Sequence, residues 1–69
     1  MENKLKKRVT MDLTQINGNA FALLGAFRAQ ARKEGWSQEE ITFVLTYAMD
    51  GDYDHLVAVL LTYSQTSNN

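Results

Sequence analysis

The residues best suited to chemistry in this chain are a cluster of carboxylates beside one imidazole: Asp50, Gly51 and Asp52, followed by Asp54 and His55. These carboxylates could bind calcium, but Ca²⁺ takes about six to eight oxygen ligands from a longer loop. A zinc site would need more His or Cys side chains than this single imidazole. Because the same carboxylates are good helix caps, we predict a structural role for them and expect neither a metal nor a cofactor.

Catalysis has few candidate residues. His55 is the only histidine and the chain has no cysteine, so a catalytic pair would have to be built around one imidazole. General acid–base chemistry also needs a positioned partner in a cleft, for which so short a chain has little room. Ser37 is better placed as a helix cap, because Glu40 follows it by three positions. We therefore predict that the protein is not an enzyme.

Basic side chains suggest a second chemistry, the binding of phosphates. They form two groups, one within residues 4–8 and one within residues 28–33. The last two helices of the chain could be compared with a helix-turn-helix motif. The second of them, however, would begin with Asp52 and Asp54 and continue with aliphatic residues, which cannot read a base edge. Nucleic-acid binding through the basic N-terminal arm is therefore the second hypothesis.

Aromatic and arginine side chains dominate the binding energy of protein–protein interfaces, and this chain offers several of them. Trp36 also suits a structural role, since a tryptophan buries a large area where two helices meet. Sequence alone does not separate the aromatic residues of the core from those of the surface. The residues that we predict to contact a partner are Phe21, Arg28, Arg32, Trp36, Phe43, Tyr47, Tyr53 and Tyr63.

The first element that must position these side chains is a helix over residues 20–34. Asn19 is a suitable N-cap for it, and Gly35 is a suitable residue to end it. Gly25 lies in the interior of this helix, where glycine costs about 1 kcal/mol relative to alanine. We expect another backbone to pass close to Gly25 and to explain its presence.

Two further helices follow with almost no loop between them. Ser37 opens the second helix, and Gly51 is predicted to end it in the left-handed conformation. Asp52 caps a third helix over residues 53–63. Residues 56–61 are apolar without a break, which indicates burial on more than one side and a contact beyond the neighbouring helices. The predicted fold is all-α, a compact three-helix bundle preceded by an extended arm or short β-strand.

The remainder of the chain divides into three parts. Residues 1–8 are predicted to form a flexible basic arm, residues 9–63 the three-helix domain with its extended start, and residues 64–69 a disordered polar tail. Apolar and polar residues alternate over residues 9–13, which is typical of a half-buried strand. A lone strand leaves its edges unpaired, so this segment should either pack on the bundle or pair with another molecule.

The composition sets limits on partners and location. The chain has 69 residues, no cysteine and a formal net charge of −1, which indicates one domain without global attraction to nucleic acid or anionic lipid. No apolar run reaches the roughly 18 residues that span a bilayer, and the basic N-terminus lacks the apolar region of a signal peptide. We expect a soluble cytoplasmic protein without a membrane partner. Because chains this small often gain stability by oligomerising, a homodimer is one possibility.

Residues 12–61 resemble a family of small, uncharacterised helical proteins that are encoded by phages and related mobile elements. The resemblance implies an accessory gene product that acts in the cytoplasm of a bacterial host. The segments that carry it are Asp12-Leu13-Thr14, Gly18-Asn19-Ala20-Phe21 with Leu24-Gly25, and Gly51-Asp52-Tyr53-Asp54 with Leu56.

A second resemblance is to ubiquitin-associated domains, which are compact three-helix bundles that bind a partner through the loop after the first helix and the end of the third. Glu34 stands where those domains typically have methionine. The segments that match in order are Gly35-Trp36-Ser37, Val44-Leu45, Gly51-Asp52 and Leu60-Leu61.

Taken together, these features favour a phage-type accessory protein that acts by protein–protein interaction, with a bacterial host protein as its partner. Such a protein would inhibit or modulate the host protein by burying an apolar face against it, while charged residues at the rim set specificity. The alternatives are a small nucleic-acid-binding protein and a structural homo-oligomer in a phage assembly.

Overall fold

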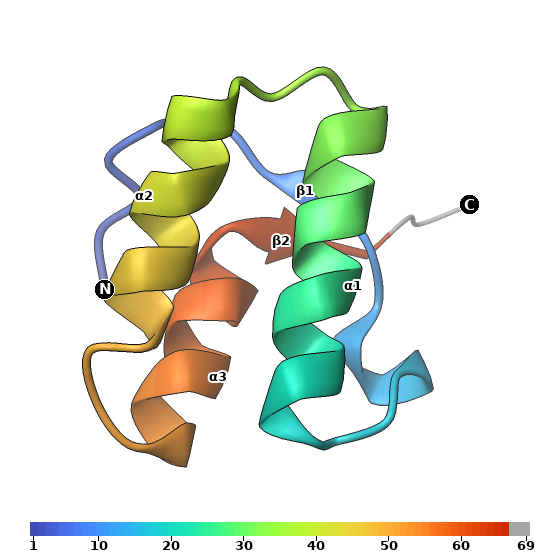
Figure 1. Cartoon of the computed structure of the whole chain (residues 1–69), viewed down its shortest axis with the longest axis vertical. Helices are drawn as coiled ribbons and strands as arrows, with labels where there is room; N and C mark the ends of the chain where they lie inside the picture. The colour runs from blue at the N-terminus through green and yellow to red at the C-terminus, as the bar shows by residue number, and fades with distance from the viewer. Residues whose placement is uncertain (67–69) are drawn as a thin grey trace.

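The computed structural model describes residues 1–66, which form three α-helices and a two-stranded sheet. In Figure 1, α1 lies on one side and α2 and α3 on the other, with the strands behind them. The three helices confirm the predicted bundle, and the sheet adds to it. In chain order the elements are β1 (Val9–Thr10), a 3₁₀ turn (Leu13–Gln15), α1 (Ala20–Lys33), α2 (Gln38–Ala48), α3 (Tyr53–Thr62) and β2 (Ser64–Gln65).

The predicted caps begin the three helices. The Asn19 side chain accepts a hydrogen bond from the Phe21 N–H at 2.8 Å at the start of α1. Ser37 and Glu40 form the complete capping box of α2, each side chain accepting from the other residue's N–H. The Asp52 carboxylate accepts from the backbone N–H of the third helical residue at 2.9 Å. Each bond satisfies an N–H group that has no partner within its helix, so the sequence sets these starting points locally.

Gly35, after α1, and Gly51, after α2, have different structural roles. Gly35 has a φ of +87°, as a C-terminal glycine in the left-handed conformation should. Gly51 does not have a positive φ, so the left-handed conformation predicted for it is wrong. A Cβ on Gly51 would lie 2.7 Å from ring atoms of His55, so this glycine leaves room for the imidazole.

No backbone of this chain approaches Gly25, so the close contact predicted there is not formed within the molecule. Gly25 is exposed on α1, and no atom lies within 4 Å of the position that its Cβ would take. The helix therefore bears the cost of a glycine without an internal contact that requires one.

Replacing Gly25 with alanine should stabilise the fold by about 1 kcal/mol, because alanine restricts the unfolded chain and fits the helical backbone without a clash. The free energy of unfolding in urea, measured at low protein concentration, checks this. Gly35→Ala is the matched control and should destabilise, since its φ of +87° is unfavourable for a residue with a Cβ. A loss of stability in Gly25→Ala would show that the site is more constrained than its open surroundings indicate.

The core lies between the three helices and the short sheet. Val57 and Leu45 pack at its edge, as do apolar residues from the segment before α1. That N-terminal segment supplies the further contact that the apolar run in α3 predicts. No helix of residues 1–66 is long and apolar enough to cross a membrane. The buried residues are Val9, Leu23, Phe27, Ala31, Trp36, Ile41, Val44, Ala48, Leu56, Val59, Leu60 and Tyr63.

The extended segment finds its partner strand within the same chain. β1 and β2 run parallel, with Val9 opposite Ser64. The Val9 N–H donates to the Tyr63 carbonyl and the Met11 N–H to the Gln65 carbonyl, both at 2.9 Å. The segment therefore packs on the bundle, which is the first of the two alternatives, with Val9 completely buried, and it also pairs with β2 of the same chain. Ser64 and Gln65, which belong to the predicted disordered tail, form β2, while residues 67–69 of that tail lie outside the described residues.

Residues 1–8 are predicted to be a flexible arm, but hydrogen bonds tie them to the bundle. The Asn3 amide donates to the Thr62 carbonyl at 3.1 Å, and its oxygen accepts from two N–H groups of the same turn. The Lys4 N–H donates to the Tyr63 hydroxyl at 3.1 Å. Because one asparagine can satisfy several backbone groups, a polar segment becomes part of the folded surface.

Candidate functional site

The structure places two of the predicted contact residues in the core. Tyr63 is completely buried and Trp36 is 7% exposed, so neither side chain is available to a partner on this surface. Both assignments are corrected here, and the physical reason is the same: large aromatic side chains gain most by filling the space between elements. The other predicted residues are exposed, namely Phe21, Arg28, Arg32, Phe43, Tyr47 and Tyr53.

Trp36 connects α1, α2 and the N-terminal segment. Its ring meets Phe27 edge to face, with centroids 5.6 Å apart at 89°. The Lys7 Nζ lies 5.1 Å from the Trp36 ring centroid and forms an ion pair with Glu40 at 3.0 Å. One positive charge of the predicted basic arm is therefore used within the molecule.

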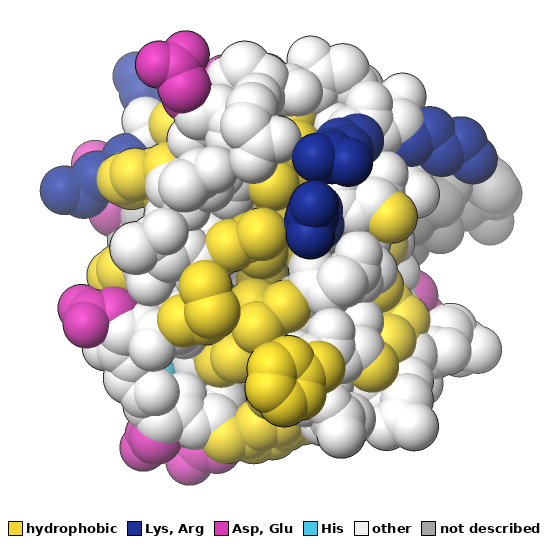
Figure 2. Space-filling model, in the orientation of Figure 1, with side chains coloured by type: hydrophobic (Ala, Val, Ile, Leu, Met, Phe, Trp, Pro, Cys, Tyr) yellow, Lys and Arg dark blue, Asp and Glu magenta, His cyan; other side chains and the backbone are white. Residues whose placement is uncertain are grey.

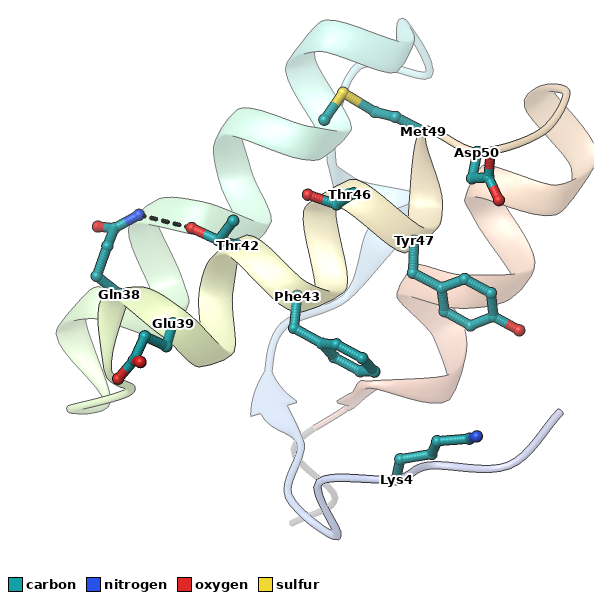
Figure 3. A pocket seen from close by; sticks show the side chains of 9 residues that line it. All are labelled: Lys4, Gln38, Glu39, Thr42, Phe43, Thr46, Tyr47, Met49 and Asp50. Atoms are coloured by element: carbon teal, nitrogen blue, oxygen red, sulfur yellow. Dashed lines mark hydrogen bonds between the residues drawn. The ribbon is translucent and has the colours of Figure 1, made fainter.

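The exposed aromatic residues of α2 line a groove on the surface (Figure 3). Phe43 and Tyr47 are four residues apart on one side of the helix, with ring centroids 6.4 Å apart and planes tilted by 34°. They are 41% and 36% exposed. The groove has a volume of about 950 Å³. Its lining residues are Lys4, Gln38, Glu39, Thr42, Phe43, Thr46, Tyr47, Met49 and Asp50.

The Tyr47 side chain is held from behind by α3. The His55 imidazole meets the Tyr47 ring edge to face at a centroid distance of 5.2 Å. Its Nε2 lies 2.8 Å from the Tyr47 carbonyl oxygen, and it donates to that oxygen when Nε2 carries a proton. Because the Asp52 carboxylate accepts from the His55 N–H, the cap of α3 and the orientation of Tyr47 depend on one another. The carboxylate and imidazole cluster of the sequence thus supports the groove wall.

The groove combines an apolar floor with charged edges. Met49 is 58% exposed and adds a flexible apolar side chain on the other side of α2 from the two aromatic rings (Figure 3). Glu39 and Asp50 supply carboxylates, and Lys4 supplies an ammonium group on the side of the aromatic rings (Figure 3). Within residues 1–66 no group of three or more His, Cys, Asp or Glu side chains is arranged to hold a metal ion. Such a surface suits contact with another macromolecule through apolar burial.

Seven of the nine groove residues were not among the predicted contact residues, Met49 and Lys4 among them. Met49 could not be grouped with Phe43 from sequence, because it follows that residue by six positions and same-face neighbours on a helix are three or four positions apart. Lys4 could not either, since only the folded N-terminal segment brings it across from the aromatic pair.

The remaining predicted residues lie on a different surface, formed by α1. Phe21, Arg28 and Arg32 face outward there, and the Arg32 guanidinium donates to the Gln38 amide oxygen at 3.2 Å. Tyr53 belongs to the start of α3, where its hydroxyl donates to the Gly18 carbonyl just before α1. None of these four residues lines the groove. The structure therefore divides the exposed predicted residues between a groove on α2 and a face on α1.

No family model, no curated protein and no solved structure matches this chain. The assignment of function therefore depends on these two surfaces.

The Glu40 carboxylate makes the stability of α2 dependent on pH. The hydrogen bond from the Ser37 N–H, and then the one from Lys7, hold the pKa of Glu40 below its ordinary value. A lowered pKa in the folded state gives a stabilisation that is complete above the unfolded-state pKa and is lost as pH falls through the folded-state pKa.

We expect wild type to be more stable than Glu40→Gln at neutral pH, and the difference to shrink as pH falls below about 4. Unfolding in urea across this range measures it. Lys7→Met removes only the smaller of the two contacts to the Glu40 carboxylate. The stability of this variant should therefore still fall over the same pH range, but by less than that of wild type. If the difference in unfolding free energy between wild type and Glu40→Gln did not change with pH, the lowered pKa of Glu40 would not be its cause.

Proposed function

We propose that the protein is a non-enzymatic binding protein that acts by protein–protein interaction through the groove on α2. The observation that carries this proposal is the exposed pair Phe43 and Tyr47 on one side of α2. Burying the exposed apolar surface of these two neighbouring aromatic side chains against a partner is favourable by about 25 cal/mol per Å².

The support of Tyr47 by His55 favours this use of the groove. A side chain that is already oriented loses less conformational freedom when a partner binds, so more of the contact energy appears as affinity. The carboxylates of Glu39 and Asp50 at the edges favour a partner segment that carries apolar side chains with basic residues beside them.

The resemblance to phage-encoded proteins leads us to propose a bacterial host protein as this partner, met in the host cytoplasm. Binding would occlude a functional surface of the host protein and so inhibit or modulate it. This is the action expected of a short chain that offers an apolar groove and no arranged metal site within its described residues.

We expect capture experiments from bacterial lysate to separate the groove from the rest of the surface. Wild type should retain a host protein that Phe43→Ser with Tyr47→Ser does not retain. Leu61→Ser is the matched control, because Leu61 is 56% exposed on α3 and lies outside the groove. For the captured protein, calorimetry should give an affinity loss of roughly 30-fold or more, which corresponds to about 2 kcal/mol for an interface hot spot.

Equal capture by the double variant and wild type would contradict the assignment to the groove. Circular dichroism of both variants verifies that the fold is retained, as expected for exposed positions. Capture that disappears after nuclease treatment would favour the nucleic-acid hypothesis instead. In that case affinity for a labelled duplex should fall steeply with added salt.

A further inference from the structure

We propose that the outward face of α1 is the interface of a homodimer, occupied by a second copy of this chain. Phe21, Gly25, Arg28 and Arg32 lie three or four residues apart and so share one side of the helix. Phe21 is 84% exposed, although fully burying a phenylalanine contributes about 1.5–3 kcal/mol. This inference is independent of the groove on α2, which none of these residues lines.

The face has the charge pattern that a twofold interface needs. Figure 2 looks onto the broadest side of the molecule, which measures 30 × 26 Å. Hydrophobic side chains gather near its centre, Lys and Arg side chains border them over α1, and Asp and Glu side chains mark the corner where α3 begins.

Gly25 defines where two α1 helices can cross. It lies between the exposed phenylalanine and the arginines, and nothing approaches its Cβ position within 4 Å. A twofold axis through Gly25, perpendicular to α1, packs the helix antiparallel to its copy. Residues equally far from Gly25 then face each other, so that Phe21 meets Ala29 of the second copy and Arg32 meets Gly18 of the second copy. The glycine permits close backbones, and the alanine leaves room for the ring.

The charges complete this arrangement. The Tyr53 hydroxyl donates to the Gly18 carbonyl, which fixes the start of α3 beside the start of α1. Asp52 and Asp54 flank Tyr53, so the arginine end of each α1 approaches the acidic corner of the other copy. Among the described residues Arg32 forms no ion pair, and its guanidinium is exposed. In a twofold dimer each contact between the two copies is repeated by symmetry, so this contact between arginines and carboxylates occurs twice.

A second copy of this chain fits the charges at both ends of the face, the arginine end of α1 and the acidic corner where α3 begins. An acidic protein segment or a nucleic acid would find the arginines favourable but would meet the carboxylates of the α3 corner at the other end. A twofold copy matches each end with the opposite charge and at the same time buries the exposed phenylalanine.

The test is the solution mass of the 7.8 kDa chain by light scattering, from low micromolar to near-millimolar concentration. We expect wild type to reach twice the chain mass. Arg28→Glu with Arg32→Glu, and separately Asp54→Lys, should each weaken self-association by more than about tenfold, because like charges then face each other. An equimolar mixture of these two variants should form a heterodimer, since their charges are complementary again.

Gly25→Leu is the second, independent variant. Leucine is a better helix former than glycine, so the monomer should fold at least as well, while its side chain blocks the crossing of two α1 helices. We expect circular dichroism to be unchanged and the dimer to be lost. A wild type that stays monomeric overturns the proposal. So does a dimer that survives both the charge reversals and Gly25→Leu, or a mixture of the reversed variants that stays monomeric.

Discussion

Tyr63→Ala should leave most of the chain unfolded at room temperature. The Tyr63 side chain is completely buried where α3, the sheet and the N-terminal segment meet. Replacing a buried large aromatic residue with alanine costs about 3–5 kcal/mol, through lost transfer free energy and the cavity left behind. A single small domain without disulfides has a total stability of about the same size. The loss should therefore appear as a collapse of the urea unfolding transition, followed by the fluorescence of Trp36.

Tyr63→Phe separates the ring from its hydroxyl. The hydroxyl accepts the Lys4 N–H at 3.1 Å, so its removal leaves that N–H without this acceptor and should cost about 1 kcal/mol. The N-terminal segment should loosen first, which hydrogen exchange at Lys4 would detect. A Tyr63→Ala protein with nearly wild-type stability would mean that Tyr63 is a surface residue, as the sequence-based assignment to a partner interface implied.

Trp36→Ala is expected to be destabilising to a similar degree, again by about 3–5 kcal/mol. It removes the edge-to-face contact with Phe27 and the ring that Lys7 covers. Because Trp36 is the only tryptophan, circular dichroism in urea replaces fluorescence as the measurement. Trp36→Phe keeps an aromatic ring against Phe27 and should lose clearly less stability.

The informative comparison is between Trp36→Ala and Phe43→Ala. Phe43 is 41% exposed, so its truncation should change stability by well under half of the Trp36 effect while removing a wall of the groove. If Phe43→Ala were the more destabilising of the two, the division between core and groove would be incorrect.

The helices follow from local chemistry, which is why sequence reasoning placed them well. Asn19, Ser37 and Asp52 each satisfy N–H groups within a few residues of themselves, and no distant contact is needed for that. The predicted starts of all three helices agree with the structure. The first and third helices end one residue before their predicted ends, and α2 ends at Ala48, three residues before Gly51.

The exposure of each aromatic residue depends on distant neighbours. Trp36 is buried because Phe27 and Lys7 reach it from α1 and the N-terminal segment, while Phe43 remains exposed because its side of α2 has no element packed over it. Both residues are large and aromatic, so the sequence gives them the same propensity. Only the packing of the elements decides which one is buried and which one faces a partner.

Sequence by itself determined the helical segments, the capping box and the absence of cysteine chemistry, because each depends on residue type and short spacing. The tertiary structure alone decided that β1 pairs with β2 and that the N-terminal segment packs on α3. Those contacts join residues more than fifty positions apart, as between Val9 and Ser64. Pairing at such separations is set by the shape and burial of the whole core, which no local pattern contains.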